Sequence, residues 1–110
     1  MHPRRGEVWW VAFDPSVGGE IQKTRPAIIL SNNAANAALN RLIVVPITSQ
    51  ANKVYPSEAR IKLNGEPRKA MADQLTTASK RRLRSKLGEL SISDLGAVES
   101  AILFHLGIRR

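Results

Sequence analysis

The chain contains 110 residues and carries a formal net charge of +8, from 17 lysines and arginines against 9 aspartates and glutamates. A small protein with this balance favours a polyanionic partner: a nucleic acid, an anionic membrane surface or an acidic protein. Cysteine is absent, which excludes a disulfide framework, a cysteine–zinc site and a thiol nucleophile. No apolar stretch has the length of a transmembrane helix or follows the N-terminal charges as a secretory signal does, so we expect a cytoplasmic protein.

The length predicts a single domain over residues 1–110 with one modest hydrophobic core. Residues 7–13 are rich in aromatic and β-branched side chains and predict the first strand. A long loop follows over residues 14–24, because an Asp-Pro pair starts a turn and two glycines permit positive φ angles. The short apolar run at residues 26–30 predicts a buried strand, with Pro26 expected at its start or on a sheet edge.

The middle of the chain predicts a short helix between strands. Residues 34–39 are alanine-rich and follow three polar capping candidates, which is typical of a short helix. Residues 42–47 predict a strand with a proline at which the hydrogen-bond ladder must break or bulge. Residues 58–63 alternate between charged and apolar side chains, the period of a half-exposed strand, and Asn64-Gly65 then predicts a tight turn.

The last third of the chain predicts one more strand and a final helix. Residues 69–75 form the candidate strand, and residues 80–86 are a basic stretch that either contacts phosphates or is a solvated turn and helix start. Ser91 or Ser93 is expected to cap a helix with an apolar stripe, and Gly107 is expected to end it. The elements together predict a mainly β, α+β fold: a small barrel-like antiparallel sheet, a short inserted helix and a C-terminal helix.

Three short segments, taken together and in order, carry the functional signal. Residues 5–10 read Arg-Gly-Glu-Val-Trp-Trp, residues 25–30 read Arg-Pro followed by an apolar run, and residues 46–49 read Pro-Ile-Thr-Ser. With Asp-Gln at residues 73–74, this combination resembles the MazF/Kid (PemK) family of toxins from toxin–antitoxin pairs. The resemblance runs from residue 5 to the final helix, which is nearly the whole chain.

The resemblance implies both a fold and an activity. Members of this family are SH3-like small barrels that form homodimers, and most are sequence-specific endoribonucleases that cleave single-stranded RNA, often mRNA, without a metal or a cofactor. The substrate's own 2′-hydroxyl attacks the adjacent phosphate and leaves a 2′,3′-cyclic phosphate and a 5′-hydroxyl. A cognate antitoxin with a disordered, often acidic tail covers the RNA groove and blocks it.

The resemblance assigns the catalytic pair to Arg25 and Thr48, and the chemistry of these side chains fits the reaction. Transesterification by a 2′-hydroxyl needs an aligned phosphate, stabilisation of developing negative charge and movement of protons. The guanidinium of Arg25 is a fork that matches two phosphate oxygens, and the proline after it favours an extended backbone at this residue. The hydroxyl of Thr48 can bond the phosphate or relay a proton.

Further RNA contacts are expected near this pair. These candidates come from the loop before Arg25, from the segment after Thr48 and from the Asp-Gln pair: Glu20, Gln22, Lys23, Ser49, Gln50, Lys53, Asp73 and Gln74. Their side chains donate to or accept from the edges of unstacked bases. Tyr55, in the same segment as Lys53, is either a stacking residue for a base or a packing residue.

The general base is left open by the sequence. One branch of the family is assigned an aspartate base, an arginine two residues before it and a loop histidine. Asp73 matches the aspartate, but Met71 stands at the arginine position and the loop from residue 14 to residue 24 contains no histidine. We therefore expect Asp73 to contact RNA or tune the local charge, with Glu20 as a weaker candidate for the base.

Two other functions compete with the ribonuclease. The CcdB toxins share the barrel but bind DNA gyrase through a C-terminal Trp-Gly-Ile, whereas this chain ends Leu-Gly-Ile-Arg-Arg and carries the Arg-Pro and Pro-Ile-Thr-Ser segments. Composition alone also fits a nucleic-acid-binding module without catalysis. The sequence leaves open the cleavage motif, the class of target RNA, the cognate antitoxin and the stoichiometry of its complex.

Overall fold

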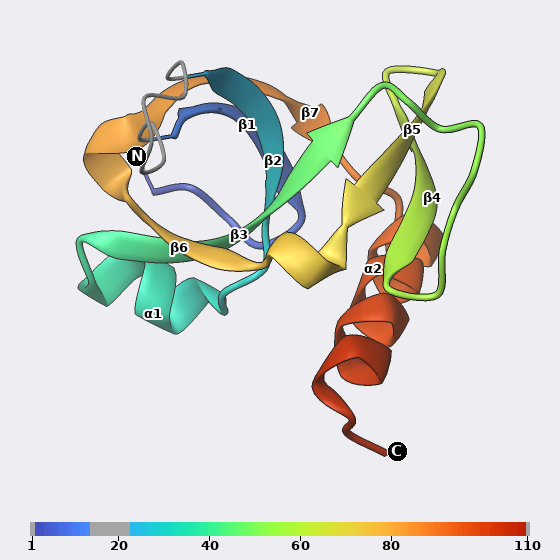
Figure 1. Ribbon diagram of the computed structural model, residues 1–110. Helices are drawn as coiled ribbons and strands as arrows, with labels where there is room; N and C mark the ends of the chain where they lie inside the picture. The colour runs from blue at the N-terminus through green and yellow to red at the C-terminus, as the bar shows by residue number, and fades with distance from the viewer. Residues whose placement is uncertain (1, 14–22, 110) are drawn as a thin grey trace, which may run out of the picture.

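The computed structural model describes residues 2–13 and 23–109, which form an antiparallel sheet and two α-helices (Figure 1). The strands are β1 (Glu7–Ala12), β2 (Thr24–Ile29), β3 (Arg41–Thr48), β4 (Glu58–Leu63), β5 (Glu66–Met71), β6 (Thr76–Ser79) and β7 (Leu83–Glu89). The helices are α1 (Asn33–Ala38) and α2 (Ile92–Leu106), with 3₁₀ helices η1 (Ala72–Gln74) and η2 (Lys80–Arg82). No helix of these residues is long and apolar enough to cross a membrane.

The sheet curls into a half-barrel, as the sequence predicts. Its strand order is β4-β5-β3-β2-β1-β7, and β6 pairs with β3 on the side that faces away from β2. Figure 1 shows β1, β2, β3, β6 and β7 curving round a common centre, with the β4–β5 hairpin to one side. β3 is the shared strand, since its first half pairs with β6, its middle with β2 and its end with β5.

Pro26 ends the ladder between β2 and β3. The amide of Leu30 donates to the carbonyl of Ile43 at 2.9 Å, and bonded and non-bonded pairs alternate along an antiparallel ladder. In this register the bonded pairs recur every second residue, so Ile28 pairs with Val45 and the next bonded pair would join Pro26 to Ile47. Proline has no N–H to donate to the Ile47 carbonyl, so the ladder stops there. Of the two predicted places for Pro26, the strand start is wrong, because β2 begins at Thr24. The edge position is confirmed locally, because at Pro26 β2 pairs with β1 but not with β3.

Pro46 ends the other ladder of β3 by the same rule. The amide of Lys80 donates to the carbonyl of Asn40 at 2.9 Å, so the bonded pairs of β3 with β6 recur at every second residue from Asn40. Pro46 would occupy one of these positions, and the ladder with β6 ends before it, at Val44. Beyond Pro46, β3 pairs with β5 instead.

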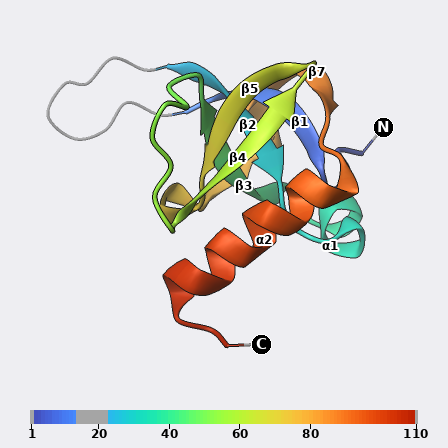
Figure 2. The ribbon, with the colours of Figure 1, turned by 90° about the vertical axis from the view of Figure 1, so that its right-hand side faces the viewer.

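Two hydrophobic clusters fill the two faces of the sheet. Val8, Ile28 and Val45 belong to the cluster beneath α2 and the β4–β5 hairpin, and Figure 2 shows α2 lying across this hairpin. Ile29 and Val44 belong to the second cluster, inside the curl of the barrel. Because successive residues of a strand point to opposite faces, burial on both faces explains the unbroken apolar runs of β2 and β3.

The final helix begins and ends at capping residues. The Ser91 hydroxyl accepts the amide of Asp94 at 3.0 Å, so Ser91 is the N-cap and Ser93 is not. Gly107 adopts φ 71° and closes the last turn, as predicted. The carboxylate of Asp94 also accepts the amide of Lys62 at 2.9 Å, which fastens the start of α2 to β4.

Two further regions differ from their sequence prediction, and β6 has no predicted counterpart. The strand predicted at residues 69–75 runs instead from Glu66 to Met71, because η1 turns the chain at residue 72. The first three residues of the basic stretch form the short 3₁₀ helix η2, but the predicted longer helix does not follow, because β7 begins at Leu83. Arginine and lysine are poor strand signals, so only contact with β1 makes this stretch a strand.

Candidate functional site

A cavity of about 480 Å³ opens where β2 and β3 separate. Its polar lining residues are Arg25, Thr48, Ser49, Asn64, Glu66 and Arg68. Its apolar lining residues are Trp10, Pro26, Ile47, Leu63 and Leu87. The structure therefore brings Arg25 of the Arg-Pro motif together with Thr48 and Ser49 of the Pro-Ile-Thr-Ser motif at one cavity.

The strand ends place the two predicted catalytic side chains. Arg25 is the second residue of β2, pairs with Val11 of β1 and is half-buried. Thr48 is the last residue of β3 and is also half-buried. Among residues 2–13 and 23–109, no carboxylate forms an ion pair with Arg25. A guanidinium without an internal counter-ion at a cavity is suited to an anionic ligand.

The Thr48 hydroxyl has a defined hydrogen-bond role. The amide of Gln50 donates to Thr48 Oγ1 at 3.3 Å. A hydroxyl that accepts one bond keeps its own hydrogen for donation. Thr48 is therefore able to donate to an anionic oxygen placed in the cavity.

The tip of the β4–β5 hairpin forms the far wall of the cavity. Asn64 and Gly65 have φ angles of 51° and 83°, the left-handed pair that a tight hairpin requires. The Asn64 side-chain amide donates to the carbonyl of Leu87 on β7 at 3.2 Å, and a Cβ atom at Gly88 would lie 3.0 Å from the Asn64 oxygen. The hairpin thus packs tightly against β7, which brings Glu66 to the cavity rim.

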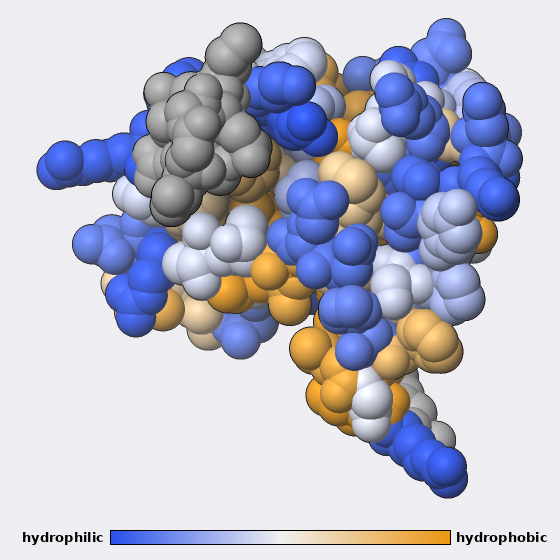
Figure 3. Space-filling model, in the orientation of Figure 1, coloured by the Kyte–Doolittle hydropathy of each residue, from blue (hydrophilic) through white to orange (hydrophobic). Residues whose placement is uncertain are grey.

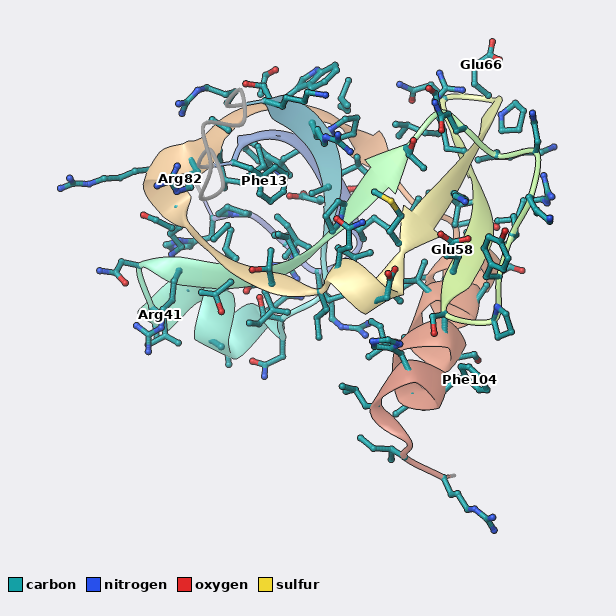
Figure 4. The ribbon with its side chains drawn as sticks, viewed as in Figure 1. Phe13, Arg41, Glu58, Glu66, Arg82 and Phe104 are labelled. Carbon is teal, nitrogen blue, oxygen red and sulfur yellow. The ribbon has the colours of Figure 1, made fainter. Side chains whose placement is uncertain are left out.

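Four polar or aromatic lining residues lie outside the set predicted from the sequence: Trp10, Asn64, Glu66 and Arg68. The Asn-Gly pair predicts the turn, but nothing local to it indicates that the turn contacts β7. Figure 4 shows the Glu66 side chain directed away from the body of the fold. It adds negative charge at the rim without contacting Arg25.

The remaining RNA-binding candidates lie at different distances from the cavity. Gln50 and Lys53 belong to the segment that leaves Thr48, and Lys23 is exposed just before β2. Asp73 and Gln74 are exposed on η1 and do not line this cavity. Glu20 and Gln22 lie outside the described residues.

A second and larger hollow, of about 620 Å³, lies between α1, α2 and β3. It is lined mainly by apolar side chains, among them Leu30, Leu39, Ile43, Ile102 and Leu103. At the edge of this hollow, an ion pair between Arg5 and Glu99 joins the segment before β1 to α2. Figure 3 shows hydrophobic atoms gathered in this region and along the end of α2. Figure 4 places Arg41 near α1, at the opposite side of the fold from Glu66.

The basic stretch is partly neutralised. The Lys86 ammonium lies 3.1 Å from carboxylate oxygens of both Glu7 and Glu89, and these hydrogen bonds, that of Glu89 first, raise the pKa of Lys86. Burial acts to raise the pKa of the Glu7 carboxyl, but hydrogen bonds from the Arg4 amide, the Trp9 indole and Lys86 hold it below its ordinary value. Within residues 2–13 and 23–109, no cluster of three histidine, aspartate or glutamate side chains can hold a metal ion.

Comparison with known proteins decides the family. A model of the PemK-like, MazF-like toxins of type II toxin–antitoxin systems matches residues 4–106. The chain belongs to this family. It is 36% identical to endoribonuclease MazF9 of Mycobacterium tuberculosis over 96% of this chain and 97% of that protein. A second M. tuberculosis protein, a probable endoribonuclease MazF1, is 49% identical over 46% of this chain and 59% of its own length.

Solved structures of the family share the fold. The crystal structure of MazF from Deinococcus radiodurans superimposes with a TM-score of 0.83 at 29% identity, covering 98% of this chain and 99% of that one. A MazE–MazF structure from the same organism gives a TM-score of 0.81 at 28% identity and covers 99% of both chains. These MazF relatives support the ribonuclease expectation and not the gyrase-binding alternative.

Proposed function

We propose that this chain is the toxin of a toxin–antitoxin pair and acts in the cytoplasm as a sequence-specific, metal-independent endoribonuclease on single-stranded RNA, with Arg25 and Thr48 as its catalytic pair. The observation that carries this assignment is the shared cavity of these two residues at the β2–β3 separation. The family membership and the relatives named endoribonuclease support the activity.

The reaction is an attack by a ribose 2′-hydroxyl on the adjacent phosphorus. The bond from phosphorus to the 2′-oxygen forms and the bond to the 5′-oxygen breaks, so the products are a 2′,3′-cyclic phosphate and a 5′-hydroxyl. A proton leaves the 2′-hydroxyl and a proton reaches the departing 5′-oxygen. The protein supplies alignment and charge stabilisation, and no metal or enzyme nucleophile takes part in these steps.

Arg25 and Thr48 divide the charge stabilisation. The guanidinium of Arg25 donates two parallel hydrogen bonds to the non-bridging phosphate oxygens, whose negative charge grows in the transition state. Thr48 donates its hydroxyl hydrogen to the same phosphate while the Gln50 amide holds the oxygen in place. Ser49, next along the chain, adds a second hydroxyl at the cavity.

RNA recognition extends from this cavity along the segment that follows β3. Ser49, Gln50 and Lys53 provide donors and acceptors for bases and backbone, and Lys23 provides positive charge before β2. Asp73 and Gln74, exposed on η1, contact RNA that continues past the cavity. Glu20 and Gln22 of the preceding loop complete the set assigned from the sequence.

The chain forms a homodimer through the large apolar hollow. Leu106 at the end of α2 and Ile108 just after it are 55% and 52% exposed, and Leu106 lies one helical turn from Leu103, which lines the hollow. An apolar surface of this kind marks an interface, and a symmetric pair of copies covers it on both chains. Leu103→Asp should shift the species in sedimentation equilibrium to monomer, whereas Ile92→Asp, at the far end of α2, should leave the dimer intact.

The antitoxin is an acidic partner of this basic chain. The net charge of +8 favours association with an acidic, disordered tail, and this attraction weakens as salt is raised. A purified antitoxin with an acidic tail should therefore inhibit RNA cleavage, and this inhibition should weaken as the salt concentration is raised. Inhibition that does not change with salt would contradict the electrostatic part of this assignment.

The experiment that tests the function is incubation of the purified chain with a defined long single-stranded RNA in EDTA. Cleavage at a short recurring motif, with 2′,3′-cyclic phosphate ends, is the expected result. RNA binding without cleavage would favour a nucleic-acid-binding module, and neither binding nor cleavage would overturn the proposal.

A further inference from the structure

The segment between β3 and β4, residues 49–57, is held against the outer face of the β4–β5 hairpin by three polar contacts. The Arg60 guanidinium donates to the carbonyl of Ala51 at 2.8 Å, and the Lys69 ammonium donates to the carbonyl of Lys53 at 2.9 Å. The carboxylate of Glu58 accepts the amide of Tyr55 at 3.0 Å. A connecting segment fixed at three points presents its side chains in one arrangement.

Lys69 is the central residue of this arrangement. Besides the Lys53 carbonyl, its ammonium contacts Glu58 Oε1 at 2.9 Å, and the side chains of Lys69 and Glu58 are only 12% and 13% exposed. Burial acts to raise the pKa of the Glu58 carboxyl, but the Tyr55 amide and the Lys69 ammonium together lower it below its ordinary value. Figure 4 marks Glu58 at the start of β4. The Glu58 carboxylate therefore stays ionised at neutral pH.

The sheet register links Lys69 and its contacts to Thr48. Lys69 is the direct cross-strand partner of Thr48 on β3 and of Arg60 on β4. Direct partners in an antiparallel sheet lie on the same face, with Cβ atoms about 4.5–5.5 Å apart. Lys69 and Arg60, two of the three side chains that fix residues 49–57, thus stand in one cross-strand row with Thr48.

Tyr55 is presented on this fixed segment with positive charge around it. Its side chain is 54% exposed, although large apolar rings are normally covered. The ammonium groups of Lys53 and Lys69 lie 5.7 and 5.8 Å from the centre of its ring. An exposed, pre-positioned ring flanked by cations is suited to an unpaired nucleobase and the phosphate attached to it.

We propose that Tyr55 is a base-stacking subsite for a nucleotide beside the scissile phosphate, and that Lys69 is the positioning residue that fixes it relative to Thr48. The proposal rests on the proposed RNA substrate. Tyr55 supplies binding energy that is the same before and during the reaction, because the ring contacts a base that does not react. Its loss raises KM and leaves kcat unchanged.

Binding to uncleavable RNA is the direct test. The probe is a single-stranded oligonucleotide pool with 2′-O-methyl groups, which removes the nucleophile. Tyr55→Ala should weaken its binding by about five- to a hundredfold, whereas Tyr55→Phe keeps the ring and should bind within about twofold of the unchanged chain. Equal binding by the alanine and phenylalanine variants would overturn the stacking assignment.

Lys69→Met tests the positioning role against a matched control. Lys62→Met removes the same charge from the neighbouring strand, where the lysine is exposed. Lys69→Met should speed amide hydrogen exchange at residues 50–57 and raise KM as Tyr55→Ala does, whereas Lys62→Met should change neither. If Lys69→Met fails to fold, Glu58→Gln removes the carboxylate end of the same pair and should give the same two effects. Unchanged exchange and unchanged KM would overturn the role of Lys69.

The outcomes separate this inference from the function on which it rests. If the unchanged chain binds the 2′-O-methyl pool but does not cleave RNA, the proposed catalysis fails while the binding test of Tyr55 still gives its answer. If the chain cleaves RNA and Tyr55→Ala cleaves it with an unchanged KM, the subsite fails while the function stands.

Discussion

Arg25 of β2 and Thr48 of β3 border one cavity at the point where the ladder between their strands ends. Pro26 is the residue after Arg25, and it lacks the N–H that the next bonded pair with β3 requires. Pro46 frees the end of β3 from β6 and lets it pair with β5. The prolines of the Arg-Pro and Pro-Ile-Thr-Ser motifs thus create the opening that their neighbours line.

Arg25→Lys tests whether the reaction needs the two-pronged hydrogen-bond donor of the guanidinium or only its positive charge. Lysine keeps the positive charge but cannot donate two parallel hydrogen bonds to one phosphate. We expect the single-turnover cleavage rate to fall about a hundredfold, with binding of uncleavable RNA changed far less. Arg109→Lys, in the exposed C-terminal segment, serves as the control and should cleave at the original rate.

Thr48→Ser and Thr48→Val test the hydroxyl. Serine retains the donor, so its cleavage rate should stay within about tenfold of the unchanged chain, whereas valine has the same shape without the donor and should lose about a hundredfold or more. The lost hydrogen bond from Gln50 should cost about 1 kcal/mol of unfolding free energy in the valine variant. Equal rates for serine and valine, measured at a temperature where both are folded, would remove the hydroxyl from the mechanism.

Pro26→Ala tests the role of the strand separation. The alanine amide can donate to Ile47, so the β2–β3 ladder can extend by one bonded pair and narrow the cavity. We expect an unchanged or higher melting temperature together with slower RNA cleavage. A variant that cleaves RNA at the original rate would show that the cleavage rate does not depend on the separation of β2 and β3.

Glu7 gives a pH dependence of stability with a defined sign. Its pKa is lower in the folded protein than in the unfolded chain, so its ionised form stabilises the fold above the unfolded pKa and this contribution is lost as pH falls through the folded pKa. Glu7→Gln should lower the unfolding free energy at pH 7 by about 1.5–3 kcal/mol. The difference between the two proteins should shrink below about pH 4, as followed by thermal unfolding. A difference that persists unchanged at pH 3 would assign the effect to packing and not to charge.

Local signals in the sequence predicted most of the fold. The Asn64-Gly65 turn, the β4 alternation and the capping of α2 depend on residues close together in the chain, and each is found in the structure. β7 and the position of Pro26 inside β2 depend on which strand lies alongside, and this information is not local. The same limit applies to the site. Motif residues Arg25 and Thr48 were predicted, whereas Asn64 and Arg68 reach the cavity only because the hairpin tip packs on β7.

The most direct test of the central claim is the chemistry of the RNA ends produced in EDTA by the unchanged chain and by Arg25→Ala. The account predicts cleavage at a defined motif by the unchanged chain, with a 2′,3′-cyclic phosphate on one fragment and a 5′-hydroxyl on the other. It also predicts a rate at least about a hundredfold lower for the folded Arg25→Ala variant. Undiminished cleavage by Arg25→Ala, or ends bearing a 5′-phosphate, would contradict it.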